Sequence, residues 1–130
     1  MIIPNYFEDL NRLSVNTMPR RNYYVPYSTA EAAKTSLNRR ESDLYVDLNG
    51  TWDFHYFDNV RLIDQEYWLA SNTSKLDYDS IPVPSCWQLH GYGQIQYTNT
   101  EYPIPYDPPF VPYDNPAGLY KRTLDIQTLE

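Results

Sequence analysis

The sequence predicts an all-β fold, a partial β-sandwich preceded by an extended N-terminal arm. Three observations predict it: aromatic residues that alternate with polar ones in 44–57, a second alternating stretch in 118–126, and a long proline-rich connection between them. Alternation at every second residue is typical of half-buried strands. Several strands with proline-rich connections favour a sandwich over a helical or parallel architecture.

Residues 1–43 form the predicted arm, because no strong hydrophobic period runs through them. One helix signal interrupts the arm. It lies at 28–34, where Ser28 or Thr29 is the expected N-cap and Glu31 lies close to the capping-box position. We expect the rest of the arm to run extended. Residues 44–130 then hold the first part of the sandwich.

Within the sandwich portion, Trp52, Phe54 and Tyr56 define the buried face of the first strand. Helical spacing of apolar residues predicts a short helix at 61–70. Residues 81–84 read IPVP and are expected at a sheet edge or in a loop, since proline cannot donate to a central ladder.

The stretch 81–120 contains eight of the eleven prolines of the chain, together with Trp87 and many tyrosines. Proline fixes its own φ and biases the preceding residue towards extended geometry, so this stretch cannot be a helix. It is too aromatic for a mobile linker. We therefore expect a stiff, ordered loop that presents side chains at a surface, where binding residues tend to lie.

Composition excludes several classes of protein. The chain has 130 residues and a net charge of −7, which argues against nucleic acid and anionic membranes as partners. No apolar run is long enough to span a bilayer, and the N-terminus lacks the features of a secretory signal. A single cysteine, Cys86, cannot form an internal disulfide. Together these features predict a cytoplasmic location. Because a strand begins just before the sequence stops, we expect a longer parent protein.

Few residues of the chain are candidates for chemistry. We expect the glutamates to be solvated surface charges rather than a catalytic pair; they are Glu8, Glu31, Glu41, Glu66, Glu101 and Glu130. His55 is interpreted as a strand-face residue and His90 as a loop hydrogen-bonding residue, and neither has the partners of a metal motif. We expect Cys86 to be a buried, inert thiol.

Asn99 is the strongest candidate for binding. Its amide offers one acceptor and two N–H donors, which suit sugar hydroxyls. The alternative is that Asn99 supports a turn through a hydrogen bond to the backbone two residues on, and residue chemistry alone favours this alternative. Tyr97 either lines the same pocket or only packs. Trp87 is interpreted as a core residue rather than a sugar-stacking platform.

Four motifs carry a resemblance to a known family. They are WQLHGY at 87–92, YTNTEYPIPYDPPFVPYDNPAGLYKR at 97–122, LNGTWDF at 48–54 and DLNRL at 9–13. This pattern resembles the N-terminal sugar-binding domain of family 2 glycoside hydrolases, and within that family the large bacterial β-galactosidases. The resemblance covers most of the chain, with the motifs in the same order.

The resemblance implies a jelly-roll, galactose-binding-like domain in a larger enzyme that hydrolyses terminal, non-reducing β-D-galactosyl residues with retention. It implies that both catalytic glutamates lie in a separate (β/α)₈ barrel, so that no residue of this chain is catalytic. It also implies that Asn99 contacts the galactosyl unit, which reverses the preference for the turn interpretation.

Further implications concern the whole enzyme. Its relatives use Mg²⁺ and Na⁺, for which this chain holds no complete site, and the arm packs across other domains and a subunit interface of a homo-oligomer. We expect this chain alone to be inactive. Two other classes stay open: a non-catalytic carbohydrate-binding module, marked by sugar affinity without the barrel, and a purely structural domain. β-Glucuronidase or β-mannosidase activity is a weaker alternative.

Overall fold

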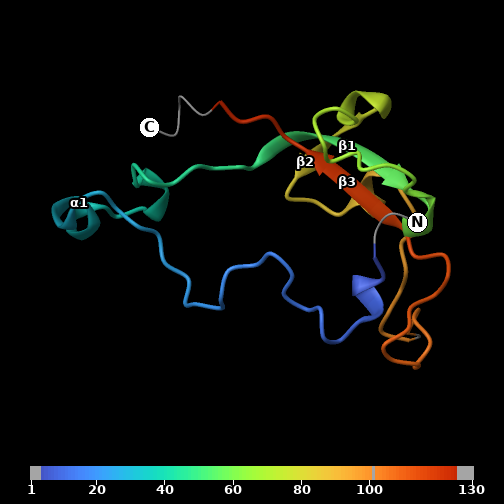
Figure 1. Ribbon diagram of the computed structural model, residues 1–130. Helices are drawn as coiled ribbons and strands as arrows, with labels where there is room; N and C mark the ends of the chain where they lie inside the picture. Colours follow the sequence, from blue (N-terminus) through green and yellow to red (C-terminus); the bar gives the residue numbers. More distant parts are fainter. Residues whose placement is uncertain (1–3, 101, 126–130) are drawn as a thin grey trace.

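The computed structural model describes residues 4–100 and 102–125 (Figure 1). Its main regular element is a three-stranded antiparallel sheet in the order β2-β1-β3. The central strand β1 is Gly50–Phe57, and its neighbours are β2, Asp79–Val83, and β3, Ala117–Lys121. The predicted all-β class is confirmed. The helical elements are short: α1 (Ala30–Thr35) and the 3₁₀ turns η1 (Tyr6–Glu8), η2 (Arg39–Glu41), η3 (Val60–Leu62), η4 (Thr73–Lys75) and η5 (Trp87–His90).

One face of the sheet carries an aromatic cluster. Phe54 lies opposite Tyr120 in the ladder, and both point to the same face because directly opposed residues do. The Phe54 ring centroid lies 4.7 Å from that of Tyr120 and 4.8 Å from that of Tyr92. Phe54 and Ile81 are fully buried. The predicted alternation of β1 therefore places its core side chain at the centre of this face.

The other face is covered by the segment that follows β1. Val60, Ile63 and Tyr67 form a buried cluster against Phe57 and Leu119. The helix predicted at 61–70 is wrong: only the turn η3 forms. These side chains pack against the sheet instead, and tertiary packing overrides a weak helix propensity.

The strand boundaries differ from the predicted ones. Residues 44–49 are not strand, and β1 starts at Gly50. The predicted second strand begins at Ala117 and ends at Lys121, and its predicted end from residue 126 onwards lies outside the described residues. The extended IPVP segment is confirmed: residues 81–83 lie in β2, which among the described strands pairs with β1 alone and is an edge strand.

The N-terminal arm leaves the sheet, runs outward to α1 and returns into β1 (Figure 1). The helix signal is confirmed, since the Thr29 side chain accepts a hydrogen bond from the Ala32 N–H at the start of α1. Most arm side chains are exposed. The boundary between residues 43 and 44 stays a prediction.

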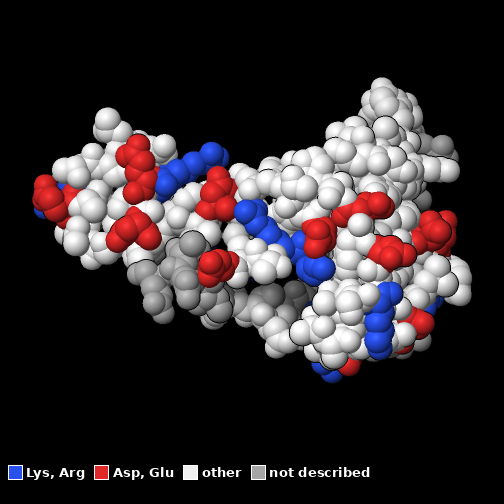
Figure 2. Space-filling view, turned by 90° about the horizontal axis from the view of Figure 1, so that it is seen from above, with Lys and Arg blue, Asp and Glu red and all other residues white. Residues whose placement is uncertain are grey.

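The charged side chains are mixed. On the face shown in Figure 2, both acidic and basic side chains appear over the arm and over the sheet portion. Among the described residues, none of the helices has the length and apolar character needed to cross a membrane.

Candidate functional site

The site begins with Trp87, the first residue of η5, which follows the edge strand β2. Its ring packs edge-on against Tyr56 with centroids 5.8 Å apart and lies 6.2 Å from the Phe54 centroid. Trp87 therefore packs against the aromatic cluster, but it is not the core residue that the sequence predicted. It is only half-buried, because one side of it lines the open hollow beside the sheet.

The chain passes Tyr56 so closely that position 93 requires glycine. Gly93 has φ +66°, and a Cβ there would lie 3.0 Å from the Tyr56 hydroxyl. Burial, together with the negative charge of Asp58, raises the pKa of Tyr56 above its ordinary value of 10.0. The Tyr56 hydroxyl is therefore held protonated, as a neutral donor, at the side of the site.

An open hollow of about 940 Å³ lies between Trp87 and the loop 94–116. Its wall combines aromatic, amide, carboxylate and apolar side chains. The lining residues are Tyr56, Asp58, Cys86, Trp87, Gln88, Leu89, Gly93, Gln94, Ile95, Gln96, Thr98, Pro103, Ile104, Val111, Pro112, Asp114, Asn115 and Pro116. Amides and carboxylates can hydrogen-bond hydroxyl groups in either direction, and an indole ring offers an apolar surface. Such a wall suits a polyhydroxylated ligand better than a purely apolar one.

Asn99 and Tyr97 lie on either side of Thr98, which lines the hollow. Both are exposed, and the Asn99 side-chain amide donates to the Tyr97 hydroxyl at 3.0 Å. The structure therefore brings the two predicted binding residues together on the loop. The alternative turn bond would use the N–H of residue 101, which lies outside the described residues. The assignment of Asn99 and Tyr97 to substrate stays a prediction.

The histidines behave as the sequence suggested. His90 Nε2 lies 3.0 Å from the Ser85 hydroxyl, and His55 in β1 lies 2.7 Å from the Asp77 carbonyl oxygen. Over residues 4–100 and 102–125, no three His, Cys, Asp or Glu side chains gather closely enough to hold a metal ion.

Two side chains differ from the predictions. Cys86 was expected to be buried but is exposed, because it lies in the turn between β2 and η5 and lines the open hollow. Glu8 was expected to be solvated, but its side chain is only 14% exposed and pairs with Arg61. Glu31, Glu41 and Glu66 are exposed as predicted, while the glutamates at 101 and 130 lie outside the described residues.

Sequence reasoning missed most of the hollow. The glutamines Gln88, Gln94 and Gln96 were not predicted, although they contribute to its polar wall. They lie six and two residues apart, a spacing that follows no strand or helix period. Arg61 was also missed, because its partners are far away in sequence.

Comparison with known proteins identifies the domain. Residues 45–129 match the family described as "Glycosyl hydrolases family 2, sugar binding domain". The chain belongs to this family. The three-stranded sheet is accordingly part of a sugar-binding β-sandwich, and the hollow and loop 94–116 lie within the matched residues.

Individual relatives agree with the family 2 assignment. The chain is 43% identical over 126 residues to a protein from Actinobacillus pleuropneumoniae named beta-galactosidase, covering 97% of this chain and 12% of that relative. It is 43% identical over 129 residues to a beta-galactosidase from Staphylococcus xylosus, with the same coverage of 97% and 12%. A beta-galactosidase from Pseudoalteromonas haloplanktis is 35% identical over 116 residues, which is 88% of this chain and 11% of that relative. The chain thus spans 12% or less of these relatives' lengths.

Proposed function

We propose that this chain is the N-terminal part of a β-galactosidase that hydrolyses terminal, non-reducing β-D-galactosyl residues, as in lactose, with retention. The observation that carries the proposal is the 43% identity over 97% of the chain to two relatives named beta-galactosidase. Retaining hydrolysis needs two carboxyl groups about 5–5.5 Å apart. The proposal places both in a barrel domain elsewhere in the protein.

The role proposed for this domain is to contact substrate through Asn99, with Tyr97 beside it. The exposed position of the Asn99 amide and its 3.0 Å bond to the Tyr97 hydroxyl support this role, because that bond uses one of the two amide N–H groups. The carbonyl oxygen and the second N–H are then available to ligand hydroxyls.

The remaining features of the proposal concern the whole protein. We propose a cytoplasmic homo-oligomer in which the arm contacts other domains and a neighbouring subunit. Exposed apolar side chains along the arm support such contacts; Leu13, Met18 and Tyr23 are each more than 70% exposed. We further propose that the whole protein uses Mg²⁺ and Na⁺, bound outside this chain, as the resemblance to family 2 enzymes implies.

The test is hydrolysis of nitrophenyl β-galactoside and nitrophenyl β-glucuronide by the full-length protein. We expect turnover of the galactoside and little of the glucuronide. Preferential turnover of the glucuronide would replace the proposed substrate class. Binding of galactosides without turnover of either substrate would replace the enzyme by a carbohydrate-binding module.

A further inference from the structure

Arg61 lies where three separate segments of the chain meet. Its Nη1 donates to the Tyr113 carbonyl oxygen at 2.8 Å, and its guanidinium carbon lies 4.7 Å from the centroid of the Tyr113 ring. Its Nη2 lies 3.8 Å from Oε1 of Glu8, and the same guanidinium lies 5.8 Å from the centroid of the Phe7 ring. The Arg61 side chain is only 22% exposed. One guanidinium therefore contacts both the N-terminal segment and the loop before β3.

Neighbouring hydrogen bonds hold the same loop. The Asn59 side-chain amide donates to the Tyr113 carbonyl oxygen at 2.6 Å, and the Val60 N–H donates to the Asn115 carbonyl oxygen at 2.8 Å. Glu8 Oε1 also accepts from the Val111 N–H at 3.4 Å. We call these contacts of Arg61, Glu8, Asn59 and Val60 with residues 111–115 the Arg61 clamp.

The Arg61 clamp holds the wall of the hollow itself. Val111 and Asn115, which it bonds, both line the hollow. They belong to the loop 94–116, on which Tyr97 and Asn99 also lie. Figure 1 shows the N-terminal segment running beside this loop, in agreement with the bond between Glu8 and Val111. Thr98, the neighbour of Asn99, lines the same hollow as Val111 and Asn115, so the Arg61 clamp holds a part of the wall that Asn99 adjoins.

Arginine is suited to this place for a chemical reason. Its planar fork can donate to the Tyr113 carbonyl and face the Glu8 carboxylate together, while its flat surface lies over aromatic rings. Lysine keeps the charge but not the fork. A neutral side chain leaves Glu8 as a largely buried carboxylate without its counter-ion, which is costly.

We propose that Arg61 is a positioning residue for the substrate loop: through the Arg61 clamp it fixes the wall at 111–115 and, by that, the place of Asn99. The proposal rests on the substrate contact proposed above for Asn99. It gives the N-terminal residues Phe7 and Glu8 a part in shaping the hollow.

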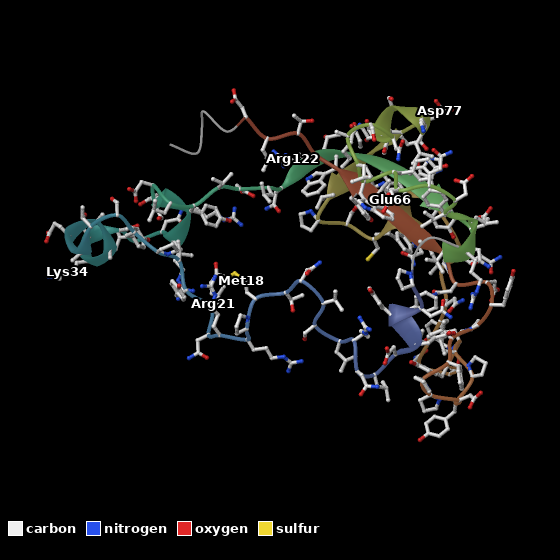
Figure 3. All side chains as sticks on the ribbon, viewed as in Figure 1. Met18, Arg21, Lys34, Glu66, Asp77 and Arg122 are labelled. Atoms are coloured by element: carbon white, nitrogen blue, oxygen red, sulfur yellow. The ribbon has the colours of Figure 1, made fainter. Side chains whose placement is uncertain are left out.

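The chain offers a matched control in Arg122. Its guanidinium donates to the Leu48 and Asn49 carbonyl oxygens and lies 5.9 Å from the Trp52 ring centroid, so it shares the carbonyl and ring contacts of Arg61 but not the ion pair with Glu8. Figure 3 shows Arg122 at the opposite end of the sheet from the loop 94–116. Losing Arg122 removes carbonyl and ring contacts like those of Arg61 without touching the hollow.

The experiment compares Arg61→Gln, Arg61→Lys and Arg122→Gln in the full-length protein. Galactoside kinetics are measured in wild-type and Asn99→Ala backgrounds, and hydrogen exchange is measured at the Val111 amide.

We expect Arg61→Gln to raise KM about tenfold or more, since small misplacements of binding groups are costly. In the Asn99→Ala background its effect should shrink to within about twofold, because the two residues act through one contact. Arg61→Lys should be intermediate, and Arg122→Gln should leave KM unchanged.

Exchange at Val111 gives a readout that does not need activity. Faster exchange in Arg61→Gln but not in Arg122→Gln supports the clamp. If Val111 exchange is unchanged, or if Arg61→Gln lowers only the apparent kcat while KM stays constant, Arg61 is merely structural and the inference is wrong. Asn99→Ala without any effect on KM, combined with faster Val111 exchange in Arg61→Gln, would reject the Asn99 contact while leaving the clamp in place.

Discussion

Gly118 lies directly beneath the indole ring of Trp87. A Cβ at position 118 would come within 2.7 Å of Trp87 Cζ3 and equally close to Phe54 Cε2, distances that real Cβ atoms essentially never show. The glycine in β3 therefore lets η5 pack against the sheet. Because the same Trp87 ring lines the hollow, this contact couples the sheet to the candidate site.

Gly118→Ala should accordingly destabilise the domain by about 1–3 kcal/mol, the usual cost of overpacking a core. Denaturant unfolding of the full-length protein, monitored by tryptophan fluorescence, measures the loss. As a control, Trp87→Phe removes the indole atoms that would clash, so Gly118→Ala should cost less in that background. An equal cost in both backgrounds would mean that the Trp87 contact is not the cause.

Alkaline pH should weaken the packing around Tyr92. The Tyr92 hydroxyl donates to Asp79 at 2.7 Å, and this bond, with burial and the charge of Asp79, raises the Tyr92 pKa above its ordinary 10.0. A raised pKa of a tyrosine means that the folded state holds the proton more tightly than the unfolded state. The stability that the bond between Tyr92 and Asp79 adds to the folded state is therefore complete below pH 10. It is lost as pH rises through the folded-state pKa of Tyr92.

The measurement is Tm against pH for wild type, Tyr92→Phe and the control Tyr106→Phe, whose parent side chain is 97% exposed. Above pH 10 the wild type and the control should lose stability more steeply than Tyr92→Phe. Parallel curves of Tm against pH for all three proteins would show that the bond between Tyr92 and Asp79 does not contribute to stability.

The isolated chain should not hydrolyse galactosides, because retaining hydrolysis needs a carboxyl pair that we assign to another domain. The chain is purified from a host without its own β-galactosidase and assayed with nitrophenyl β-galactoside. Turnover above the level of a mock purification would place catalytic groups within these residues and overturn the division of roles.

The sequence predicted the elements whose signals are local. Alternation in β1 predicted the buried position of Phe54, and the proline of β2, Pro82, indicated an edge strand, because both effects depend on neighbouring residues only. The helix predicted at 61–70 failed because Val60, Ile63 and Tyr67 pack against the sheet, which no local pattern reveals. The exposure of Cys86 depends on the direction of the turn after β2 in the same way.

The candidate site was harder to predict than the fold. Arg61 contacts Tyr113, 52 residues further along the chain. No local sequence pattern around either residue predicts this contact. The contact between Gly118 and Trp87 likewise follows from the strand register. Asn99 came from the resemblance to family 2 enzymes, since residue chemistry alone favoured a turn role.

The kinetics of Asn99→Ala in the full-length protein test the central claim most directly. Asn72→Ala is the matched control, since Asn72 is not among the residues that line the hollow and its side-chain amide donates to the Glu66 carbonyl oxygen. We predict that Asn99→Ala lowers kcat/KM for nitrophenyl β-galactoside by a transition-state cost of about 1–3 kcal/mol, the scale of a lost hydrogen bond to a buried polar group. Asn72→Ala should change it little. Equal kcat/KM in wild type and Asn99→Ala would contradict the account and reduce this domain to a scaffold.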